Sequence, residues 1–503
     1  MTSRAARLCL ALAAVTLLSG CAVTNEIGSW FNSSGKKSNL RGVRIPVMAL
    51  DSEVKPDETL AGTPVQLPPP YRNPDWPQPG GYASNALYHL AAPGRLREVW
   101  SRSAGKGTDS SSVLVSTPIV AEGLIFALDA EAHVYVFRTR DGEPVWDKRL
   151  APRNGTDWPT FWGLLGKPNT IDPPKGMGGG IAYNDGKIYV TSGFGSLIVM
   201  DAKTGKEVWR KDLGRPIFNA PVVNGGRIFV STHDNHFYAL AESDGRQLWD
   251  HQGISESAGI LASTNVAVAG ETVVVPYTSG EIYSFRVQNG QMGWSEVLSR
   301  SGQVTALSQL DDIAGRPVID RGVVYAISQS GLMAAISINN GERLWARDIG
   351  GIQTPLAAGE YVYVLDDQAR VICLTRKEGR VRWIHQMPQW ENPEDKTDAI
   401  LWAGPVLVSD KLILTSSNGY AQALSPYDGR LTGRVEIPDG TRHAVSGAGQ
   451  RRTRCPPRAG IQLRLRLPHP FREPRQSSES RQSHALAARR RARAGAGTGA
   501  RPN

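Results

Sequence analysis

Cysteine is scarce in this sequence, with four in 503 residues. Cys9 and Cys21 lie near the N-terminus, Cys455 lies near the C-terminus, and Cys373 stands alone within the apolar run RVICLT. One cysteine in the body of the chain cannot form an internal disulfide. The sequence also lacks adjacent cysteines and a C-x-x-C-H motif, which argues against a redox enzyme that carries a vicinal disulfide or an attached haem.

Apolar runs long enough to cross a membrane are not evident either. The run from Leu8 to Leu18 follows Arg4 and Arg7, and it is too short for a spanning helix. Basic residues followed by a short apolar run are the layout of a secretory signal. Because the run ends in LSGC, it resembles a bacterial lipobox, and we expect residues 1–20 to be removed and Cys21 to be lipidated. An ordinary signal peptide with an incidental cysteine is the alternative.

A basic folded domain is missing as well, although the chain carries a net charge of +10. Residues 441–503 contain fifteen Arg, two Glu and no Lys or Asp, so this tail carries +13 and the first 440 residues carry −3. A nucleic-acid-binding domain would carry the basic residues itself. We therefore expect no nucleic-acid partner, and we expect the tail to be a disordered low-complexity extension or a shifted reading frame.

What the sequence does contain is a repeat of constant internal length. Seven units begin at Pro118, Ile181, Pro221, Val266, Pro317, Pro355 and Pro405. In six of them a tryptophan follows 28 residues later, and in all seven a glycine stands four residues before that position. The segments between units vary from 10 to 35 residues. Constant units with variable connectors are typical of repeat folds whose loops carry the binding residues.

Each unit predicts a blade of a β-propeller. Two alternating runs rich in Val, Ile, Tyr and Leu indicate half-buried strands, as in KIYVTSGFGSLIVMDAKTGKEVW. The Asp/Asn-Gly turn permits a tight reversal, and the tryptophan after it is expected to dock on the neighbouring sheet. The fold class is therefore all-β, a propeller of four-stranded antiparallel blades. The expected docking residues are Trp100, Trp146, Trp209, Trp249, Trp294, Trp345 and Trp383.

Trp100 indicates how the ring closes. It resembles the outer strand of a blade, but the residues before it, including RNPDWPQPGG, are too rich in Pro and Gly for paired strands. An N-terminal strand that completes a blade with C-terminal strands would remove the exposed edges. This predicts an eighth unit after Gly433, where only IQLRLRLPHPF alternates. Seven blades with a loose N-terminal strand remain the alternative.

The chain resembles a known family over about residues 70–440. The pattern G-x-[IV]-[YF]-V…A-L-x-x-x-x-G-x-x-x-W is similar to the pyrroloquinoline-quinone-like propeller repeat. With the lipobox, the whole resembles the BamB family, and LPPPYRNPDWPQPGG and TSGEIYSFRVQNG resemble its alphaproteobacterial form. The resemblance implies an eight-bladed, non-catalytic lipoprotein on the periplasmic face of the outer membrane. It would bind the barrel-forming subunit of the β-barrel assembly machinery and aid its outer-membrane protein clients.

The resemblance also implies a partner-binding residue. Family members carry acidic residues in the connector before a central blade, and LDDIAGRP places Asp312 at the first of these positions and Ala314 at the second. From the residues themselves, Trp158 and Trp162 in TDWPTFWGLLG are candidate interface anchors on the longest connector. These aromatics could instead fold back onto the propeller.

The domain organisation follows from these features. Residues 1–20 form the signal, residues 21–92 the lipid anchor and a Pro-rich tether, residues 93–440 the propeller and residues 441–503 the tail. No cofactor and no metal site are expected, since His233 and His236 lack a third ligand in view. A propeller that binds another envelope ligand, or a quinoprotein dehydrogenase with its quinone and calcium at the propeller centre, remain as alternatives.

Overall fold

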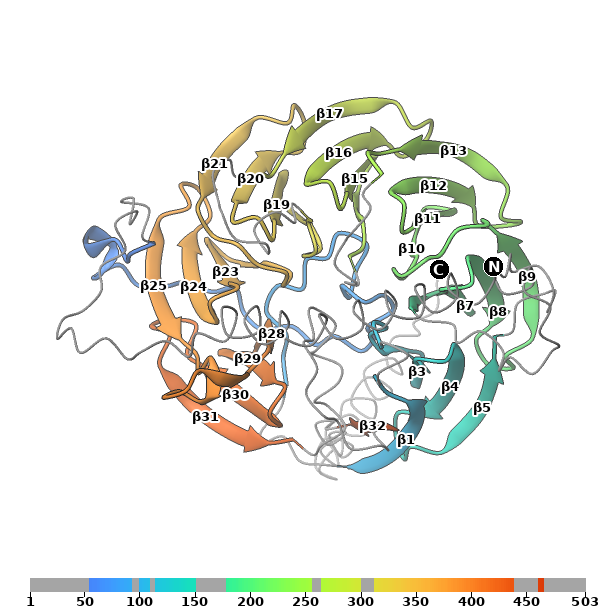
Figure 1. Cartoon of the computed structure of the whole chain (residues 1–503), viewed down its shortest axis with the longest axis horizontal. Helices are drawn as coiled ribbons and strands as arrows, with labels where there is room; N and C mark the ends of the chain where they lie inside the picture. The colour runs from blue at the N-terminus through green and yellow to red at the C-terminus, as the bar shows by residue number, and fades with distance from the viewer. Residues whose placement is uncertain are drawn as a thin grey trace, which may run out of the picture. The chain divides into compact units, whose positions relative to one another are not determined.

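The computed structural model describes residues 54–92, 99–108, 114–150, 178–255, 264–299 and 312–437, and the backbone of residues 460–465. Contacts divide the chain into residues 1–53 and residues 54–503, and every described residue lies in the second unit. Figure 1 shows this unit as a ring of blades, each with its strands stacked outward from the centre. None of the described segments is a helix with the length and apolar character that a membrane span requires.

Seven sheets of four antiparallel strands follow one another along the chain. Blade 1 consists of β2 (Ile119–Ala121), β3 (Leu124–Leu128), β4 (His133–Arg138) and β5 (Pro144–Arg149), and blade 2 of β6 (Gly179–Asn184), β7 (Lys187–Ser192), β8 (Ser196–Asp201) and β9 (Glu207–Asp212). Blade 3 consists of β10 (Val222–Asn224), β11 (Arg227–Ser231), β12 (His236–Ala241) and β13 (Gln247–Gln252), and blade 4 of β14 (Ala267–Ala269), β15 (Thr272–Pro276), β16 (Glu281–Arg286) and β17 (Met292–Val297). The prediction of four-stranded antiparallel blades is confirmed.

The remaining blades have the same order. Blade 5 consists of β18 (Val318–Asp320), β19 (Val323–Ile327), β20 (Met333–Ser337) and β21 (Arg343–Arg347), and blade 6 of β22 (Leu356–Ala358), β23 (Tyr361–Leu365), β24 (Arg370–Thr375) and β25 (Val381–Gln386). Blade 7 consists of β28 (Trp402–Val408), β29 (Lys411–Ser416), β30 (Tyr420–Leu424) and β31 (Leu431–Glu436). A hairpin of β26 (Trp390–Asn392) and β27 (Thr397–Ala399) lies between blades 6 and 7.

The hydrophobic core lies between neighbouring blades. One apolar cluster joins each consecutive pair, so Val134 of blade 1 packs in the same cluster as Ile188 of blade 2. The strands were expected to be half-buried, but the middle strands are buried on both faces. In β8, for example, five of six positions are buried. The reason is that a blade is covered by a sheet on each side, so both of its faces lose contact with water.

A bulge recurs near the outer edge of every blade. Between the third and fourth strands the register shifts once, as between Val199 and Met200, which face Trp209 and Glu207. The extra residue on the fourth strand is the one before the tryptophan position, Val208 in blade 2. A bulge bends its strand and re-aims the adjacent side chain. In each blade it therefore sets the direction of the residue that follows it.

The position between blades 7 and 1 holds a two-stranded sheet. Strand β1 (Trp100–Lys106) pairs antiparallel with β32 (Gly460–Leu465), and Trp100 lies opposite Leu465. This pairs the N-terminal strand with the stretch GIQLRL of the C-terminal tail. Among the described residues, these two strands are the whole of the sheet at this position.

The antiparallel order defines two ends of the ring. Turns between the first and second strands and between the third and fourth strands lie at one end, which we name the turn end. Turns between the second and third strands and the connectors between blades lie at the other, which we name the connector end. Long connectors and their residues therefore gather on a single end of the propeller.

A buried ion pair joins blades 5 and 6 at the turn end. Arg376, which follows β24, donates through Nη2 to the carboxylate of Asp320 at the end of β18. The two side chains are 9% and 3% exposed. Nε of Arg376 donates to the Gly359 carbonyl at 2.8 Å, and its guanidinium lies 5.7 Å from the ring centre of Tyr325. Burial and then the nearby negative charge of Asp320 raise the pKa of the Tyr88 hydroxyl.

Residues 54–92 pack on the propeller. The sequence predicts a Pro-rich tether here, and the structure instead places these residues across the ring, as the blue trace in Figure 1 shows. A short 3₁₀ helix, η1 (Glu58–Leu60), lies near their start. Prolines favour extended backbone in either case, so composition alone does not separate a solvated tether from a bound strand.

Candidate functional site

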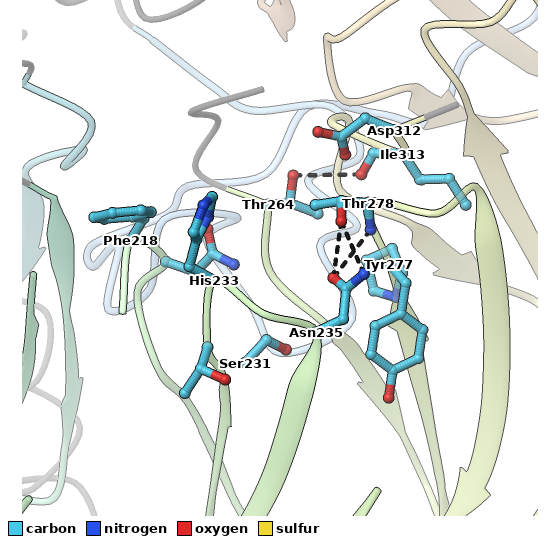
Figure 2. Close-up of a pocket in the computed structure, with 12 residues that line it drawn as sticks. Phe218, Ser231, His233, Asn235, Thr264, Tyr277, Thr278, Asp312 and Ile313 are labelled. Carbon is cyan, nitrogen blue, oxygen red and sulfur yellow. Dashed lines mark hydrogen bonds between the residues drawn. The ribbon is translucent and has the colours of Figure 1, made fainter. Parts of the chain in front are cut away.

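A pocket at the connector end lies where blades 3, 4 and 5 meet. Blade 3 contributes its second-to-third-strand turn and the connector before it, blade 4 contributes the corresponding segments, and the connector into blade 5 completes the wall. The cavity measures about 40 Å³, which leaves room for a few water molecules or one small polar group. Figure 2 shows Phe218 and His233 on one side, and Thr278, Asp312 and Ile313 on the other.

The pocket wall is held by polar contacts. Asn235 donates through Nδ2 to the Thr278 hydroxyl at 2.8 Å and to the Ile254 carbonyl, and its Oδ1 accepts from the Thr278 backbone N–H. The Thr264 hydroxyl donates to the Ala314 carbonyl at 2.6 Å. The Asn235 bonds join the turn of blade 3 to the turn of blade 4, and the Thr264 bond joins the connectors into blades 4 and 5, so the wall is held by contacts within the chain.

An aromatic pair forms the opposite wall. Phe218 and His233 meet edge to face, with ring centroids 4.8 Å apart. The sequence predicts no metal site at His233, and the structure packs its ring on Phe218. His236 lies with its Nε2 2.7 Å from the carboxylate of Asp250. Among the residues that the structure describes, no three His, Cys, Asp or Glu side chains are grouped to hold a metal ion.

Asp312 lies in this pocket but is more buried than a surface contact residue. Its residue exposure is 3%, and its backbone carbonyl accepts from the Gln329 N–H at 2.9 Å. Burial arises because Ile313 and Ala314, which follow it, are packed into the core and draw the connector inward. Asp312 therefore belongs to the pocket wall rather than to an open surface, and a bulky substitution at this position would disturb the wall.

Three other predicted site residues lie outside the described residues. They are the lipidation candidate Cys21 and the two candidate anchors, Trp158 and Trp162. Their assignments stay predictions.

The seven docking tryptophans lie over the next blade along the chain. Trp345 of blade 5 covers Gly379 of blade 6, where an added Cβ would lie 2.6 Å from an indole carbon. The same relation holds for Trp100–Gly142, Trp146–Gly205, Trp209–Gly245, Trp249–Gly290, Trp294–Gly341 and Trp383–Gly429. Each of these glycines has φ between 65° and 74°, a conformation that favours glycine. The glycine and the tryptophan of the repeat thus meet across a blade interface.

The indole nitrogens fix the same register. Trp345 donates through Nε1 to the Arg376 carbonyl at 2.8 Å, three residues before Gly379. Corresponding bonds of 2.8–3.2 Å join Trp100 to Thr139, Trp146 to Ala202, Trp249 to Val287, Trp294 to Ile338 and Trp383 to Pro426. The indole ring buries a large apolar area between two blades, and the hydrogen bond of its N–H fixes how the ring is oriented there.

Behind the pocket lies a histidine, His251, whose pKa is lowered by burial. His251 on β13 lies with Nδ1 2.8 Å from the Tyr277 hydroxyl and with its ring 4.7 Å from that of Phe285. Desolvation lowers the pKa of His251 below its ordinary value of 6.5, and Glu281 opposes the effect. Burial raises the pKa of Tyr277, so its hydroxyl stays protonated and can donate to the neutral imidazole.

This histidine predicts a pH dependence of stability. Because the folded chain holds His251 neutral, the unfolded chain takes up the proton first as the pH falls below 6.5. We expect the free energy of unfolding to be highest above that pH and to decrease below it. Denaturant unfolding at pH 7.5 and pH 5.5 measures the slope, and His251→Gln should make it smaller. An unchanged slope in the variant would assign the pH dependence to other groups.

The fold also raises the question of a quinone at the propeller centre. There, Trp76, Gln78 and Asn85 bond to the innermost strands, so the chain itself uses backbone groups that face the centre. A quinone at the centre would have to displace these bonds, so the groups that make them are not free to hold it.

Comparison with known proteins agrees with the repeat. A family model described as outer membrane protein assembly factor BamB matches residues 148–385. BamB from Moranella endobia (strain PCIT) is 27% identical over 315 residues, which is 63% of this chain and 74% of the relative. The structure of BamB from Moraxella catarrhalis aligns with a TM-score of 0.53 at 15% identity, covering 68% of this chain and 92% of that one. The chain is a BamB-like protein.

The fold of this BamB-like chain is shared more widely. A europium-containing methanol dehydrogenase aligns with a TM-score of 0.55 at 14% identity, covering 72% of this chain and 85% of that one. At this identity the likeness concerns the fold alone, since one propeller architecture carries many functions.

Sequence reasoning missed several residues that build the site. Asn235, Thr264 and Phe218 belong to no motif, and their roles depend on contacts between connectors of different blades. The signal that could have indicated the pocket was their place in connectors and turns of one end. Nothing in the sequence marks which of those positions face each other.

Proposed function

We propose that this protein is a non-catalytic accessory subunit of an outer-membrane β-barrel assembly machinery. Its BamB relatives are named as outer membrane protein assembly factors, which supports this role. The preformed pocket at the connector end carries the proposal, because loops at one end of a rigid ring are suited to binding another protein. We propose that this end binds the barrel-forming subunit while lipidated Cys21 holds the protein at the periplasmic face of the outer membrane.

The mode of binding follows from the pocket. Its cavity is small, so a partner would insert the polar end of one side chain rather than a large group. Asp312 supplies an acidic wall, and the Phe218–His233 pair supplies an apolar one. A basic side chain whose apolar stem lies along the aromatic pair matches both walls. Acidic side chains of the partner would be disfavoured by the same carboxylate.

The substitution Asp312→Asn tests this site while preserving shape. We expect Kd for the barrel-forming subunit to rise about tenfold, because removing the charge from a buried polar contact costs about 1–3 kcal/mol. Wild-type and variant proteins would be captured from detergent-extracted outer membranes, with partners quantified by mass spectrometry and Kd measured on the purified pair.

The matched control is Asp244→Asn, an exposed acid in the turn between β12 and β13 at the opposite end. It should leave partner recovery unchanged. Equal binding by Asp312→Asn would remove this residue from the contact. Absence of the barrel-forming subunit from the wild-type capture, with the propeller folded, would contradict the proposed function and leave another envelope ligand as the subject of the search.

A further inference from the structure

An N-terminal segment crosses the centre of the ring. Residues 64–92, which we name the inner segment, run past the innermost strands of the blades with turns near Gly81 and Asn85, and the blue trace passes through the middle of Figure 1. Trp76 pairs with Val120 of β2 in both directions, at 2.5 and 2.9 Å. The next residue, Pro77, accepts from the Tyr183 N–H of β6 at 2.7 Å. Blades 1 and 2 are thus held by two consecutive residues.

The same segment then reaches blades 3, 4 and 5. Gln78 donates through Nε2 to the Val223 carbonyl of β10 at 2.9 Å. The carbonyls of Ala83 and Ser84 accept from inner-strand amides, at 2.7 and 3.0 Å. Those amides belong to Val268 of β14 and Ile319 of β18. These backbone hydrogen bonds form only when the inner segment is aligned in one position along the first strands of the blades.

Asn85 is the residue that ties two blades at once. Its Nδ2 donates to the Val266 carbonyl at 3.1 Å and to the Pro317 carbonyl at 2.9 Å, positions that begin the first strands of blades 4 and 5. Its residue exposure is 4%, and its φ is 58°, in the left-handed region that Asn tolerates better than most residues. The neighbouring Ala86 packs in the core cluster shared by blades 5 and 6.

The segment ends on blade 7. Leu90 donates to the Leu407 carbonyl at 3.0 Å and accepts from the Ser409 N–H at 2.8 Å. The Ser409 hydroxyl bonds to both the N–H and the carbonyl of Ala92, at 2.8 and 2.9 Å. Buried His89 accepts from the Asp410 N–H through Nε2, so its Nδ1 carries the proton that is shared with the Pro68 carbonyl.

The residues before the inner segment fasten to the outside of the ring. Asp57 accepts from Arg380 Nε at 2.7 Å, and its backbone N–H donates to the Val381 carbonyl of β25 at 2.8 Å. Arg382 of the same strand donates to the Ala61 and Thr63 carbonyls. Residues 57–92 therefore pass from the outer edge of blade 6 to the centre.

We infer that residues 57–92 are an internal clasp that holds the propeller closed and fills its centre with the protein's own backbone. Hydrogen bonds reach the innermost strands of blades 1, 2, 3, 4, 5 and 7, and the outer strand of blade 6. The eighth position of the ring holds two described strands, whereas each of the seven blades has four. Fewer strands there means fewer contacts that close the ring. The clasp supplies that closure from the other end of the chain. The inference does not depend on the proposed partner.

Protease resistance tests the clasp in the unmodified protein. Chymotrypsin has potential sites at Tyr71, Tyr82 and Tyr88. A clasp should resist cleavage there, because a protease must first pull the backbone out of its hydrogen bonds. A synthetic peptide of residues 64–92 gives the rate for the unbound sequence. Cleavage of the full chain at the peptide's rate would overturn the clasp and restore a flexible tether.

Substitution of Asn85 tests the connection between blades. Asn85→Leu keeps the approximate size and removes both bonds to blades 4 and 5, so hydrogen exchange on peptides covering β14 and β18 should accelerate about tenfold or more. The control Asn340→Leu changes an exposed carboxamide that bonds only within its own turn. Equal exchange in the two variants would overturn the inference.

A second variant keeps the test decisive if Asn85→Leu does not fold. Ser409→Ala removes the two hydroxyl bonds at the far end of the clasp and leaves the strand pairing of blade 7 in place. Faster exchange in residues 71–92, with unchanged exchange in β29 and β30, supports the clasp. No change in residues 71–92 would show that their protection has another origin and would overturn it.

Discussion

Trp345→Ala should lower the free energy of unfolding by about 3–5 kcal/mol, the range for removing a large buried aromatic side chain. The residue is 6% exposed and packs in the core cluster between blades 5 and 6. Its loss would leave a cavity over Gly379 and leave the Arg376 carbonyl without its indole donor. Denaturant unfolding followed by circular dichroism and by tryptophan fluorescence measures the change.

The neighbouring residue provides the control. Leu344 is 48% exposed and occupies the bulge position before the tryptophan, so Leu344→Ala should change the free energy of unfolding by about 0.5 kcal/mol or less. If Trp345→Ala were as stable as Leu344→Ala, the indole would not be a docking residue. A Gly379→Ala variant should also destabilise, since its Cβ would collide with the same ring in a backbone conformation that suits glycine.

Asp320→Ala should cost a similar amount, about 3–5 kcal/mol, for a different reason. Removing the carboxylate leaves the buried Arg376 guanidinium, which lies against the Tyr325 ring, without its opposite charge. A buried charge that loses its partner keeps its desolvation cost. Thermal and denaturant unfolding of the purified variant would report the loss.

An exposed ion pair beside the Arg376–Asp320 pair provides a comparison for the effect of burial on stability. Arg321 and Glu360 join the same two blades at 2.7 Å, but their side chains are 54% and 69% exposed. Glu360→Ala should therefore cost about 0–1 kcal/mol. Equal effects of Asp320→Ala and Glu360→Ala would mean that water reaches Arg376 after substitution and that the buried pair contributes little.

The blades could be predicted from sequence because their signals are local and repeated. The distance from the turn glycine to the tryptophan is four residues, and the same two side chains recur in unit after unit. The contact they make in the fold is with the neighbouring unit, yet it repeats with the same spacing. A contact between adjacent repeats leaves a periodic signature, so no long-range information is needed.

The clasp and the pocket could not be predicted in the same way. Asn85 and Pro317 are 232 positions apart, and no second copy of the segment exists to reveal a pattern. The proline content of the clasp predicts an extended backbone, but it does not indicate that this backbone lies against the propeller. For Asp312 the connector was identified by resemblance, whereas its burial depends on how three blades converge. Such properties belong to the assembled ring rather than to any segment.

The tryptophan contacts run one way around the ring. Each blade places its indole over the blade that follows in sequence, from Trp100 over Gly142 to Trp383 over Gly429. At the equivalent position of blade 7 stands Gly433, which has no neighbouring atom within 4 Å of an added Cβ. A nascent chain emerging from its N-terminus would accordingly carry one uncovered indole at its growing edge, and each new blade would cover the previous one. Blade 7 would thus be the one blade of the seven that offers no indole at this position for a successor to cover.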